Sequence, residues 1–428
     1  MTTPQSAPPV TPPDPSPDPS PDPSPIDPFA PAALGPITLP NRFIKAATFE
    51  GRKPVAADAP DDDPLLAFHR SVAEGGVGLS TLAFCAVSKE GRGAPRELVV
   101  DAAAVPGLHR LTEVVHAAGA AAGIQLGHAG PVGAAVGQQS GLAPSRVFAA
   151  QAMKFTKVAT PDDLQRITAD FAQAARFAVD AGFDVVELHF GHGYLVSSFL
   201  SPRLNRRADE WGGTVEGRAR LARRVAEAVR AAVGSSVAVI AKLNMADGVP
   251  GGLWLDDSVE TARLLERDGA LDALELTGGS SFQNPMYLFR GEAPVAEMAA
   301  MFPQPLRLGL KLTAKRFMPE YPFEEAYFLP YARQFRDALS MPLILLGGIN
   351  RFETVTAALD EGFEFVAMAR ALLREPDLIA QWRDGARREG LCVHCNKCMP
   401  TIYRGTRCVL VPERVGSGLQ EHAAVDHQ

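Results

Sequence analysis

This sequence lacks long apolar runs and an excess of positive charge. It also has few cysteines. No window of 18 consecutive residues is apolar, so no membrane-spanning helix is expected. The formal net charge of −7 argues against nonspecific binding to nucleic acid or to an anionic membrane. Five cysteines in 428 residues are too few for a disulfide scaffold. The N-terminus lacks the basic start and apolar core of a secretory signal, so we expect a cytoplasmic protein.

Proline is unevenly distributed along the chain. Twelve of the 36 prolines lie within the first 28 residues, and the stretch from Pro12 to Pro25 is nearly a PSPD repeat. Such a segment buries too little apolar surface to offset the entropy of ordering it, so we predict that residues 1–30 are disordered. The whole chain is 46% apolar and 21% charged, which is a globular balance.

From Asn41 onward, amphipathic helical patterns alternate with short β-branched and apolar runs. In the clearest case, Thr160 is placed to cap a helix and Pro161 suits its first position. Gly182 is placed to end that helix, and a strand-like run follows it at 184–190.

Eight such strand-like runs are present. They span Phe43–Thr48, Gly78–Cys85, Gly123–Leu126, Asp184–Phe190, Val237–Asn244, Leu271–Thr277, Pro342–Ile349 and Phe363–Ala369. Alternating α/β units of this number predict a closed (β/α)8 TIM barrel over residues 31–385. An open doubly wound sheet would usually carry a glycine fingerprint after its first strand, and none follows Thr48. The long segment 280–339 after strand six is interpreted as an inserted cap.

Residues able to do chemistry lie at the end of the fourth expected strand and just after it, where an active site opens in such barrels. His189 and His192 stand three residues apart and Tyr194 follows. Two imidazoles can donate hydrogen bonds to one carbonyl or nitro oxygen, and a tyrosine can deliver a proton. Metal binding or plain packing remain alternatives for an isolated histidine pair.

The residues that follow narrow the interpretation. The run VELHFGHGYLVSSFLSPRLNRRADEWGG closely resembles the signature of the old yellow enzyme family of flavin-dependent oxidoreductases. The resemblance implies that His189 and His192 bind the substrate oxygen and that Tyr194 donates the proton. It also implies an FMN cofactor on the barrel, with NAD(P)H as co-substrate.

The same resemblance places the flavin ring on three expected strands. Gln125 corresponds to the glutamine at the pyrimidine edge, and Lys242 corresponds to a cation beside flavin N1 and the C2 carbonyl. Ala47 and Thr48 would lie near the isoalloxazine. Phe49 departs from the family, because relatives carry cysteine, threonine or histidine at this flavin-tuning position.

The resemblance places the FMN phosphate on the loops after the last two expected strands. Gly347 and Gly348 follow strand seven, and Ala369 and Arg370 follow strand eight. These loops commonly bind phosphate in TIM barrels. Ala369 stands where glycine is usual in the family.

Four of the five cysteines cluster in the extension 386–428. They are Cys392, Cys395, Cys398 and Cys408. In larger multidomain relatives a similar run holds a [4Fe–4S] cluster, although the spacing here is shorter. Structural zinc and free thiols remain open alternatives. The fifth cysteine, Cys85, is expected to be a buried apolar residue.

We predict an FMN-dependent oxidoreductase that passes hydride from NAD(P)H to a small-molecule substrate, an alkene activated by a carbonyl group. A dienoyl-thioester reductase or an amine dehydrogenase that uses an Fe–S centre is an alternative. A metal-stabilised, non-catalytic interaction barrel is another. Tyr287, Arg290 and Tyr321 are candidate substrate-lining residues, whereas Arg218 and Arg220 are expected to be structural. The sequence leaves the oligomeric state open.

Overall fold

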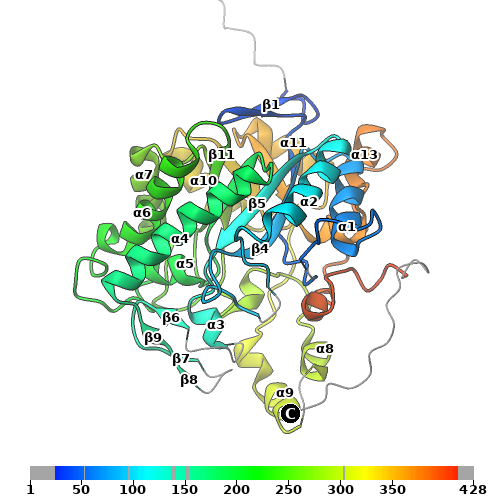
Figure 1. The fold of residues 1–428 in the computed structure, drawn as a ribbon. Helices are drawn as coiled ribbons and strands as arrows, with labels where there is room; N and C mark the ends of the chain where they lie inside the picture. Colours follow the sequence, from blue (N-terminus) through cyan, green and yellow to red (C-terminus); the bar gives the residue numbers. More distant parts are fainter. Residues whose placement is uncertain are drawn as a thin grey trace, which may run out of the picture.

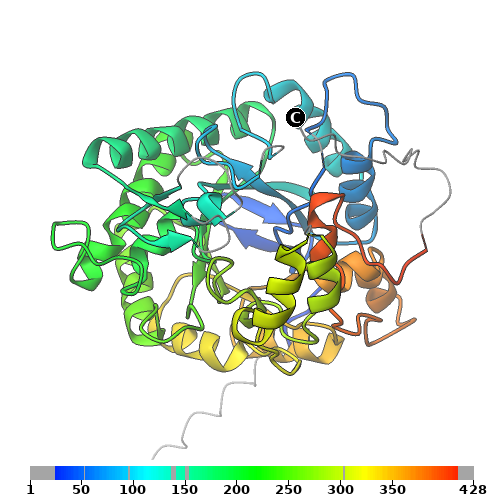
Figure 2. The same ribbon diagram turned by 90° about the horizontal axis from the view of Figure 1, so that it is seen from below.

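The protein is described from a computed structural model. The described residues are 25–52, 54–94, 97–135, 141–149, 154–301 and 304–412. Most of the proline-rich segment predicted to be disordered, residues 1–24, lies outside them. Strands surrounded by helices make up the body of the molecule (Figures 1 and 2).

Eight parallel strands close into a barrel in the cyclic order β3-β4-β5-β10-β11-β12-β13-β14. Their bounds are Phe43–Lys45, Leu79–Ala86, Ala121–Gly127, Val185–Phe190, Ala238–Asn244, Ala273–Thr277, Leu343–Leu346 and Phe365–Met368. The predicted TIM barrel is confirmed, with strand ends shifted by a few residues. The first strand is the most shortened, because the chain leaves the sheet after Lys45.

Helices pack around the outside of this barrel (Figure 2). Those that connect successive strands are α1 (Pro64–Glu74), α2 (Val105–Ala117), α4 (Pro161–Asp180), α6 (Val215–Val233), α7 (Leu255–Asp268), α10 (Leu329–Ala338) and α11 (Phe352–Asp360). Shorter helices are α3 (Pro131–Ala135), α5 (Leu195–Leu200), α8 (Val295–Ala300), α9 (Leu306–Phe317), α12 (Arg370–Arg374) and α13 (Leu378–Arg383).

Helix α4 begins and ends as its sequence predicts. Thr160 is the N-cap, Pro161 is the first helical residue, and Thr160 and Asp163 form a reciprocal capping box. Gly182 follows the helix with φ of 85°, a conformation that favours glycine. The sequence signals at both ends of this helix therefore gave correct boundaries.

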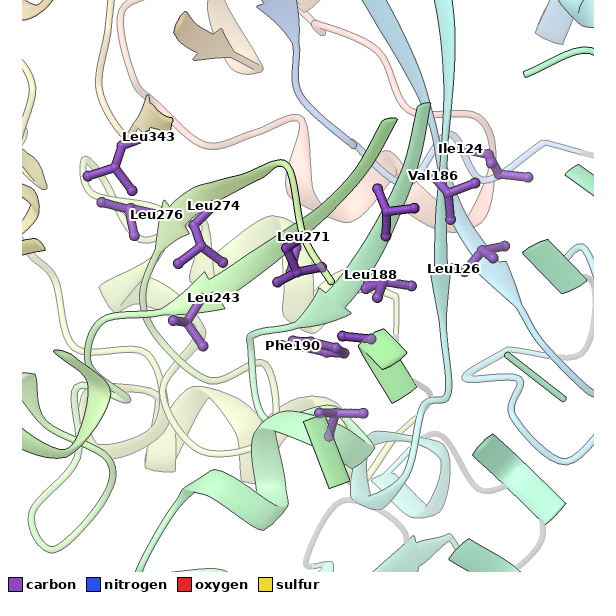
Figure 3. Close-up of a cluster of buried hydrophobic side chains, with 14 of the residues drawn as sticks. Ile124, Leu126, Val186, Leu188, Phe190, Leu243, Leu271, Leu274, Leu276 and Leu343 are labelled. Carbon is purple, nitrogen blue, oxygen red and sulfur yellow. The ribbon is translucent and has the colours of Figure 1, made fainter. Parts of the chain in front are cut away.

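Alternation along each strand separates two cores. Val186, Leu188 and Phe190 of β10 belong to the large core between sheet and helices (Figure 3). Val185 belongs to the smaller core inside the barrel, whose other members include Ile240 and Phe365. Because strand side chains alternate, Glu187 and His189 face the interior with Val185. The interior therefore becomes polar toward the carboxyl end of β10.

The two ends of the barrel differ. The hairpin β1 (Ala32–Leu34) and β2 (Ile37–Leu39) contributes to the interior core at the amino end. Beside the carboxyl end lie the short pairs β6 (Leu142–Ala143) with β9 (Lys157–Val158) and β7 (Phe148–Ala149) with β8 (Lys154–Phe155) (Figure 1).

The segment 280–339 contains the 3-10 helix η1 (Pro285–Tyr287) and helices α8, α9 and α10. Of these, α10 packs against α7 and β13 as part of the barrel ring. Helices α8 and α9 project beside the mouth, where α8 contacts the 3-10 helix η2 (Met399–Tyr403) of the cysteine-rich extension (Figure 1). The inserted segment and the extension thus meet at one end of the barrel.

Candidate active site

The three residues predicted to be catalytic lie together at the carboxyl end of β10. The ring centroids of His189 and His192 are 5.0 Å apart, and those of His189 and Tyr194 are 4.6 Å apart. Positive φ angles of 61° at His192 and 75° at Gly193 fold the chain back so that the rings approach one another. Tyr194 then leads directly into α5.

Two neighbouring strands support His192. Its backbone N–H donates to Asn244 Oδ1 at 3.0 Å, and its Nε2 lies 2.9 Å from Thr277 Oγ1. Asn244 ends β11 and Thr277 ends β12. The sequence analysis did not single out either residue. Their positions at the carboxyl ends of barrel strands were the available signal.

Both histidines are neutral at neutral pH. Burial lowers the pKa of His192 to about 3, and repulsion from Lys242 acts in the same direction. Burial also lowers the pKa of His189, followed by repulsion from His192 and Lys242. The Gly191 N–H donates to His189 Nδ1 at 3.4 Å, so a neutral His189 carries its proton on Nε2. His189 can therefore donate a hydrogen bond without carrying charge.

An aromatic wall that the sequence analysis missed stands beside these residues. The Phe84 ring centroid lies 4.9 Å from that of Tyr194 and 5.8 Å from that of His189. Phe84 and Tyr194 share an apolar cluster with Ala47 and Phe49. The position where relatives carry a flavin-tuning polar residue is therefore apolar here.

The exit of the first barrel strand is fixed by buried charge. Glu50 Oε1 lies 2.8 Å from Lys45 Nζ, and Glu50 Oε2 accepts from the Ala83 N–H at 3.1 Å. The segment between Lys45 and Glu50 carries the predicted flavin contacts Ala47 and Thr48. These bonds hold the segment against the neighbouring strand β4.

The predicted flavin-ring contacts Gln125 and Lys242 are buried on β5 and β11. Lys242 Nζ lies 2.8 Å from Glu187 Oε1 and 2.6 Å from Glu275 Oε1. Gln125 Nε2 donates to the same oxygen of Glu187. The sequence analysis treated Lys242 as a lone cation, whereas the structure pairs it with two carboxylates. It missed this pairing because the three residues lie on three different strands.

The predicted phosphate residues lie on the loops after β13 and β14. Gly347 and Gly348 adopt φ of 115° and 77°, and the rings of Phe328 and Tyr327 occupy the space that side chains at these glycines would need. Among the described residues, the N–H groups of both glycines lack a protein acceptor.

Arg370 adds charge to these loops. Its Nη1 donates to Arg290 O at 2.8 Å and to Asn396 Oδ1 at 2.5 Å, both neutral oxygens. Amide donors beside a cation whose partners are neutral suit a phosphate group. The loop residues therefore fit the phosphate end of FMN.

Four cysteine thiols line a small cavity near Arg370. Cys392, Cys395, Cys398 and Cys408 line this cavity of about 20 Å³ together with Arg370. Within the described ranges, no three side chains of the metal-binding types are gathered closely enough to hold an ion. The extension thus brings the four predicted ligands to one cavity without completing a metal site. Cys85 is buried as predicted.

The candidate lining residues form an aromatic group on the insertion. The Tyr287 and Tyr321 ring centroids are 5.5 Å apart, and the Arg290 guanidinium lies 5.4 Å from the Tyr287 ring. Tyr287 also lines a cavity of about 360 Å³ with Trp254 and residues 248–252.

The arginines of the β10 motif make structural contacts. Arg218 donates to Leu200 O and Gly213 O and pairs with Asp257. Arg220 donates to Glu210 O at 2.8 Å. These bonds support the loop after β10, in agreement with the structural role predicted for both residues.

The closed parallel barrel and the residues at its mouth define a class of protein, the flavin-dependent oxidoreductase barrels. The family model described as "NADH:flavin oxidoreductase / NADH oxidase family" matches residues 27–271. The chain belongs to this family, and the predicted resemblance to the old yellow enzyme family is confirmed.

Three similar proteins differ in what they reduce. A 4,4'-dithiodibutanoate disulfide reductase of Rhodococcus erythropolis is 57% identical, over 89% of this chain and 94% of its own length. A metal reductase of Desulforamulus reducens is 30% identical over 88% of this chain, which spans about half (52%) of that protein. The structure of morphinone reductase in complex with tetrahydroNAD has 25% identity and a TM-score of 0.64, and the match covers 85% of this chain and 92% of that one.

No helix in the described part of the chain is both long and apolar enough to cross a bilayer. The cytoplasmic location stays a prediction.

Proposed function

We propose that this protein reduces a small electrophilic acceptor with hydride from NAD(P)H carried by FMN, and that an alkene activated by a carbonyl group is one such acceptor. The observation that carries the proposal is the cluster of His189, His192 and Tyr194 at the barrel mouth. FMN would supply a carrier that accepts and releases hydride. All other steps below belong to side chains of this chain.

The proposed FMN contacts come from strands around the whole barrel. Gln125 and Lys242 would bind the pyrimidine end of the ring, and Ala47 and Thr48 would lie against it. Gly347, Gly348, Ala369 and Arg370 would bind the phosphate. The free amide donors and the neutral partners of Arg370 support this assignment.

The histidine pair would bind and polarise the acceptor oxygen. Neutral imidazole N–H groups stabilise negative charge that develops on an oxygen during hydride addition. His189 presents Nε2–H because its Nδ1 accepts from Gly191. His192 can donate from Nδ1 only if Thr277 donates its hydroxyl proton to His192 Nε2. The acceptor would thus lie between two uncharged donors.

Tyr194 would protonate the carbon next to the carbonyl group. Its ring packs against the rings of both His189 and Phe84, so two contacts hold the side chain that carries the hydroxyl. A positioned general acid contributes about 10²- to 10⁴-fold to a rate. A Tyr194→Phe variant should therefore lose alkene reduction by a factor in this range.

The experiment compares wild type and Tyr194→Phe on a cyclic enone. The variant should bind FMN normally and oxidise NAD(P)H at the wild-type rate with a one-electron dye as acceptor, because neither step requires the phenol. Unchanged enone reduction in a flavin-loaded variant would show that Tyr194 is not the proton donor.

A second candidate acceptor is an organic disulfide, which the name of the 57% identical relative favours. Burial raises the pKa of the Cys398 thiol to about 11, and burial also raises the pKa of Cys392. A thiol with such a pKa is ionised to only about one part in ten thousand at pH 7. Burial thus makes Cys398 and Cys392 poor nucleophiles for disulfide exchange, and bound FMN would be the group that supplies electrons to the disulfide.

Disulfide reduction can be tested with 4,4'-dithiodibutanoate and with the neutral disulfide of 2-mercaptoethanol, by measuring the thiols formed. Arg290 is a cationic candidate lining residue, so Arg290→Gln should raise KM for the dicarboxylate and leave KM for the neutral disulfide unchanged. Absence of thiol formation by flavin-loaded wild type would exclude the disulfide as an acceptor.

The cysteine cavity is proposed to hold a metal group, either a [4Fe–4S] cluster or structural zinc. Cys392, Cys395, Cys398 and Cys408 would be the ligands, and their shared cavity supports the assignment. A cluster would favour the dienoyl-thioester or amine alternative. Iron, acid-labile sulfide and zinc should be measured in wild type and in Cys395→Ser. Protein that contains neither metal would leave the cysteines as free thiols.

A further inference from the structure

A charged network lies inside the barrel just below the catalytic histidines. It consists of Gln125, Glu187, Lys242 and Glu275, and these residues are 4%, 0%, 1% and 0% exposed. Glu187 is paired in register with Gln125 on β5, and Lys242 with both His189 on β10 and Glu275 on β12. The network therefore spans four consecutive strands at the level where the flavin ring is proposed to lie.

Glu187 is the residue that joins the two proposed pyrimidine contacts. Its Oε1 accepts from Lys242 Nζ at 2.8 Å and from Gln125 Nε2. Because Gln125 Nε2 is the donor to Glu187 Oε1, the NH₂ group of Gln125 faces Glu187. The carbonyl oxygen of Gln125 then points the other way, as an acceptor suited to the N3–H donor of a flavin pyrimidine ring.

We infer that Glu187 is a positioning residue for the flavin: it fixes the orientation of the Gln125 amide and, with Glu275, holds and compensates the charge of Lys242. The inference rests on the proposed function, because it concerns the same flavin site. Glu187 acts through Gln125 and Lys242.

The charge balance of the network supports this role. A buried ammonium is costly unless it is paired and hydrogen-bonded. Burial works against the charged form of Lys242, but Glu187 and Glu275 outweigh it and raise the pKa of Lys242. Burial raises the pKa of Glu275 to about 7, against the opposing effect of Lys242. The network thus presents a cation whose charge is balanced by one or two carboxylates.

Removal of one carboxylate should change two separately measurable properties, the reduction potential of the bound flavin and the affinity for FMN. The loss of negative charge beside Lys242 favours the negatively charged reduced flavin, so the reduction potential of the bound flavin should rise. The loss of the acceptor for Gln125 frees its amide to rotate, so FMN affinity should fall. Glu187 contacts both Gln125 and Lys242. Of these two residues, Glu275 contacts only Lys242.

Three variants separate these effects. Glu187→Gln should raise the potential and weaken FMN binding about tenfold, as expected for the loss of one charge-assisted hydrogen bond. Glu187→Asp keeps the charge but shortens the reach, so it should weaken FMN binding with little change in potential. Glu275→Gln is the matched comparison, equally buried and paired to the same lysine but without a bond to Gln125, and should raise the potential while it lowers FMN affinity less than Glu187→Gln does.

Potentials are measured by dye-equilibrated reductive titration of the flavin-loaded proteins, and affinities by flavin fluorescence quenching. Wild-type affinity and potential in both Glu187 variants would overturn the inference. So would equal loss of FMN affinity in Glu187→Asp and Glu275→Gln, because a general loss of packing would then explain both. If Glu187→Gln does not fold, Glu187→Asp against Glu275→Gln still decides. A wild type that binds no FMN would instead overturn the proposed function and the inference together.

Discussion

In the proposed mechanism, Thr277 would determine which nitrogen of His192 can face an acceptor. Its Oγ1 lies 2.9 Å from His192 Nε2, and a hydroxyl can either donate or accept. The low pKa of His192, about 3, means that the ring has only one proton to place. If Thr277 donates, that proton resides on Nδ1 and His192 can hydrogen-bond the acceptor oxygen.

Substitution of Thr277 tests this arrangement. Thr277→Val removes the hydroxyl while it keeps the β-branched shape, so kcat/KM for an enone should fall about tenfold, the effect of losing the one hydrogen bond that orients His192. Thr277→Ser keeps a hydroxyl and should stay close to wild type. Steady-state kinetics on both variants give the comparison, and equal activities in Thr277→Val and wild type would contradict the role.

The sequence could predict the site residues that belong to a local motif, and it could not predict those defined by contacts between strands. His189, His192 and Tyr194 lie within six residues of one another, so the sequence could single them out as candidates. Glu187 lies in the same run, but its importance comes from Gln125 and Lys242 on the two adjacent strands. That contact depends on the register of the barrel, which a single sequence does not display.

At the scale of the elements, α4 shows how local signals fix a boundary. Thr160 Oγ1 accepts from the Asp163 N–H at 3.1 Å, and Asp163 Oδ2 accepts from the Thr160 N–H at 3.0 Å. Both bonds satisfy amide donors that the first helical turn leaves free. The cap lies outside the proposed active site, so it affects the stability of the protein separately from catalysis.

Loss of this cap has a predictable cost. Thr160→Ala should lower the free energy of unfolding by about 1 kcal/mol. Thr160→Ser retains the hydroxyl, so its free energy of unfolding should stay within a few tenths of a kcal/mol of the wild-type value. Urea unfolding measures both, and enone reduction should be unchanged in both. An equal loss in Thr160→Ser would contradict the capping account.

The elements were more predictable than the connections between them. All eight barrel strands were found because apolar runs alternate with amphipathic helices along the chain. The insertion was recognised only by its length, and it contains α10, which belongs to the barrel ring. Phe84, Tyr327 and Phe328 were missed because each is an ordinary apolar residue in sequence. Only the fold places their rings against Tyr194, the proposed proton donor, or against Gly347 and Gly348.

At the scale of the whole molecule, the mouth is assembled from segments distant in sequence. Asn396 of the extension donates to Phe289 O and Glu292 O of the insertion, and Thr406 N–H donates to Glu50 O after the first barrel strand. The His394 and Phe323 rings stack at 3.3 Å. The cysteine-rich extension is therefore fastened to both the insertion and the barrel.

Buried histidines make the folded state sensitive to acid. Burial is the leading cause that lowers the pKa of His128 and His192 to about 3, and it lowers those of His69 and His189 as well. The unfolded chain binds protons near pH 6.5 that the folded chain rejects, so stability is present above that pH and is lost as pH falls. Each such histidine should contribute about 1.4 kcal/mol per pH unit below about pH 6.

Urea unfolding between pH 7 and pH 4.5 measures this slope. His128→Gln should reduce the slope by about 1.4 kcal/mol per pH unit, the contribution of one proton, even if the variant is also less stable at pH 7. A stability that does not fall below pH 6 would contradict neutral burial of these histidines.

The central claim is that the barrel mouth holds one FMN that takes hydride from NAD(P)H and gives it to the acceptor. The most direct measurement is the visible absorption spectrum of purified protein that has been reconstituted with FMN and desalted, recorded without oxygen as NAD(P)H and then enone or disulfide are added. The account predicts one FMN per chain, whose visible absorbance is bleached by NAD(P)H and restored by the acceptor. Protein that retains no flavin, or flavin that NAD(P)H does not bleach, would contradict it.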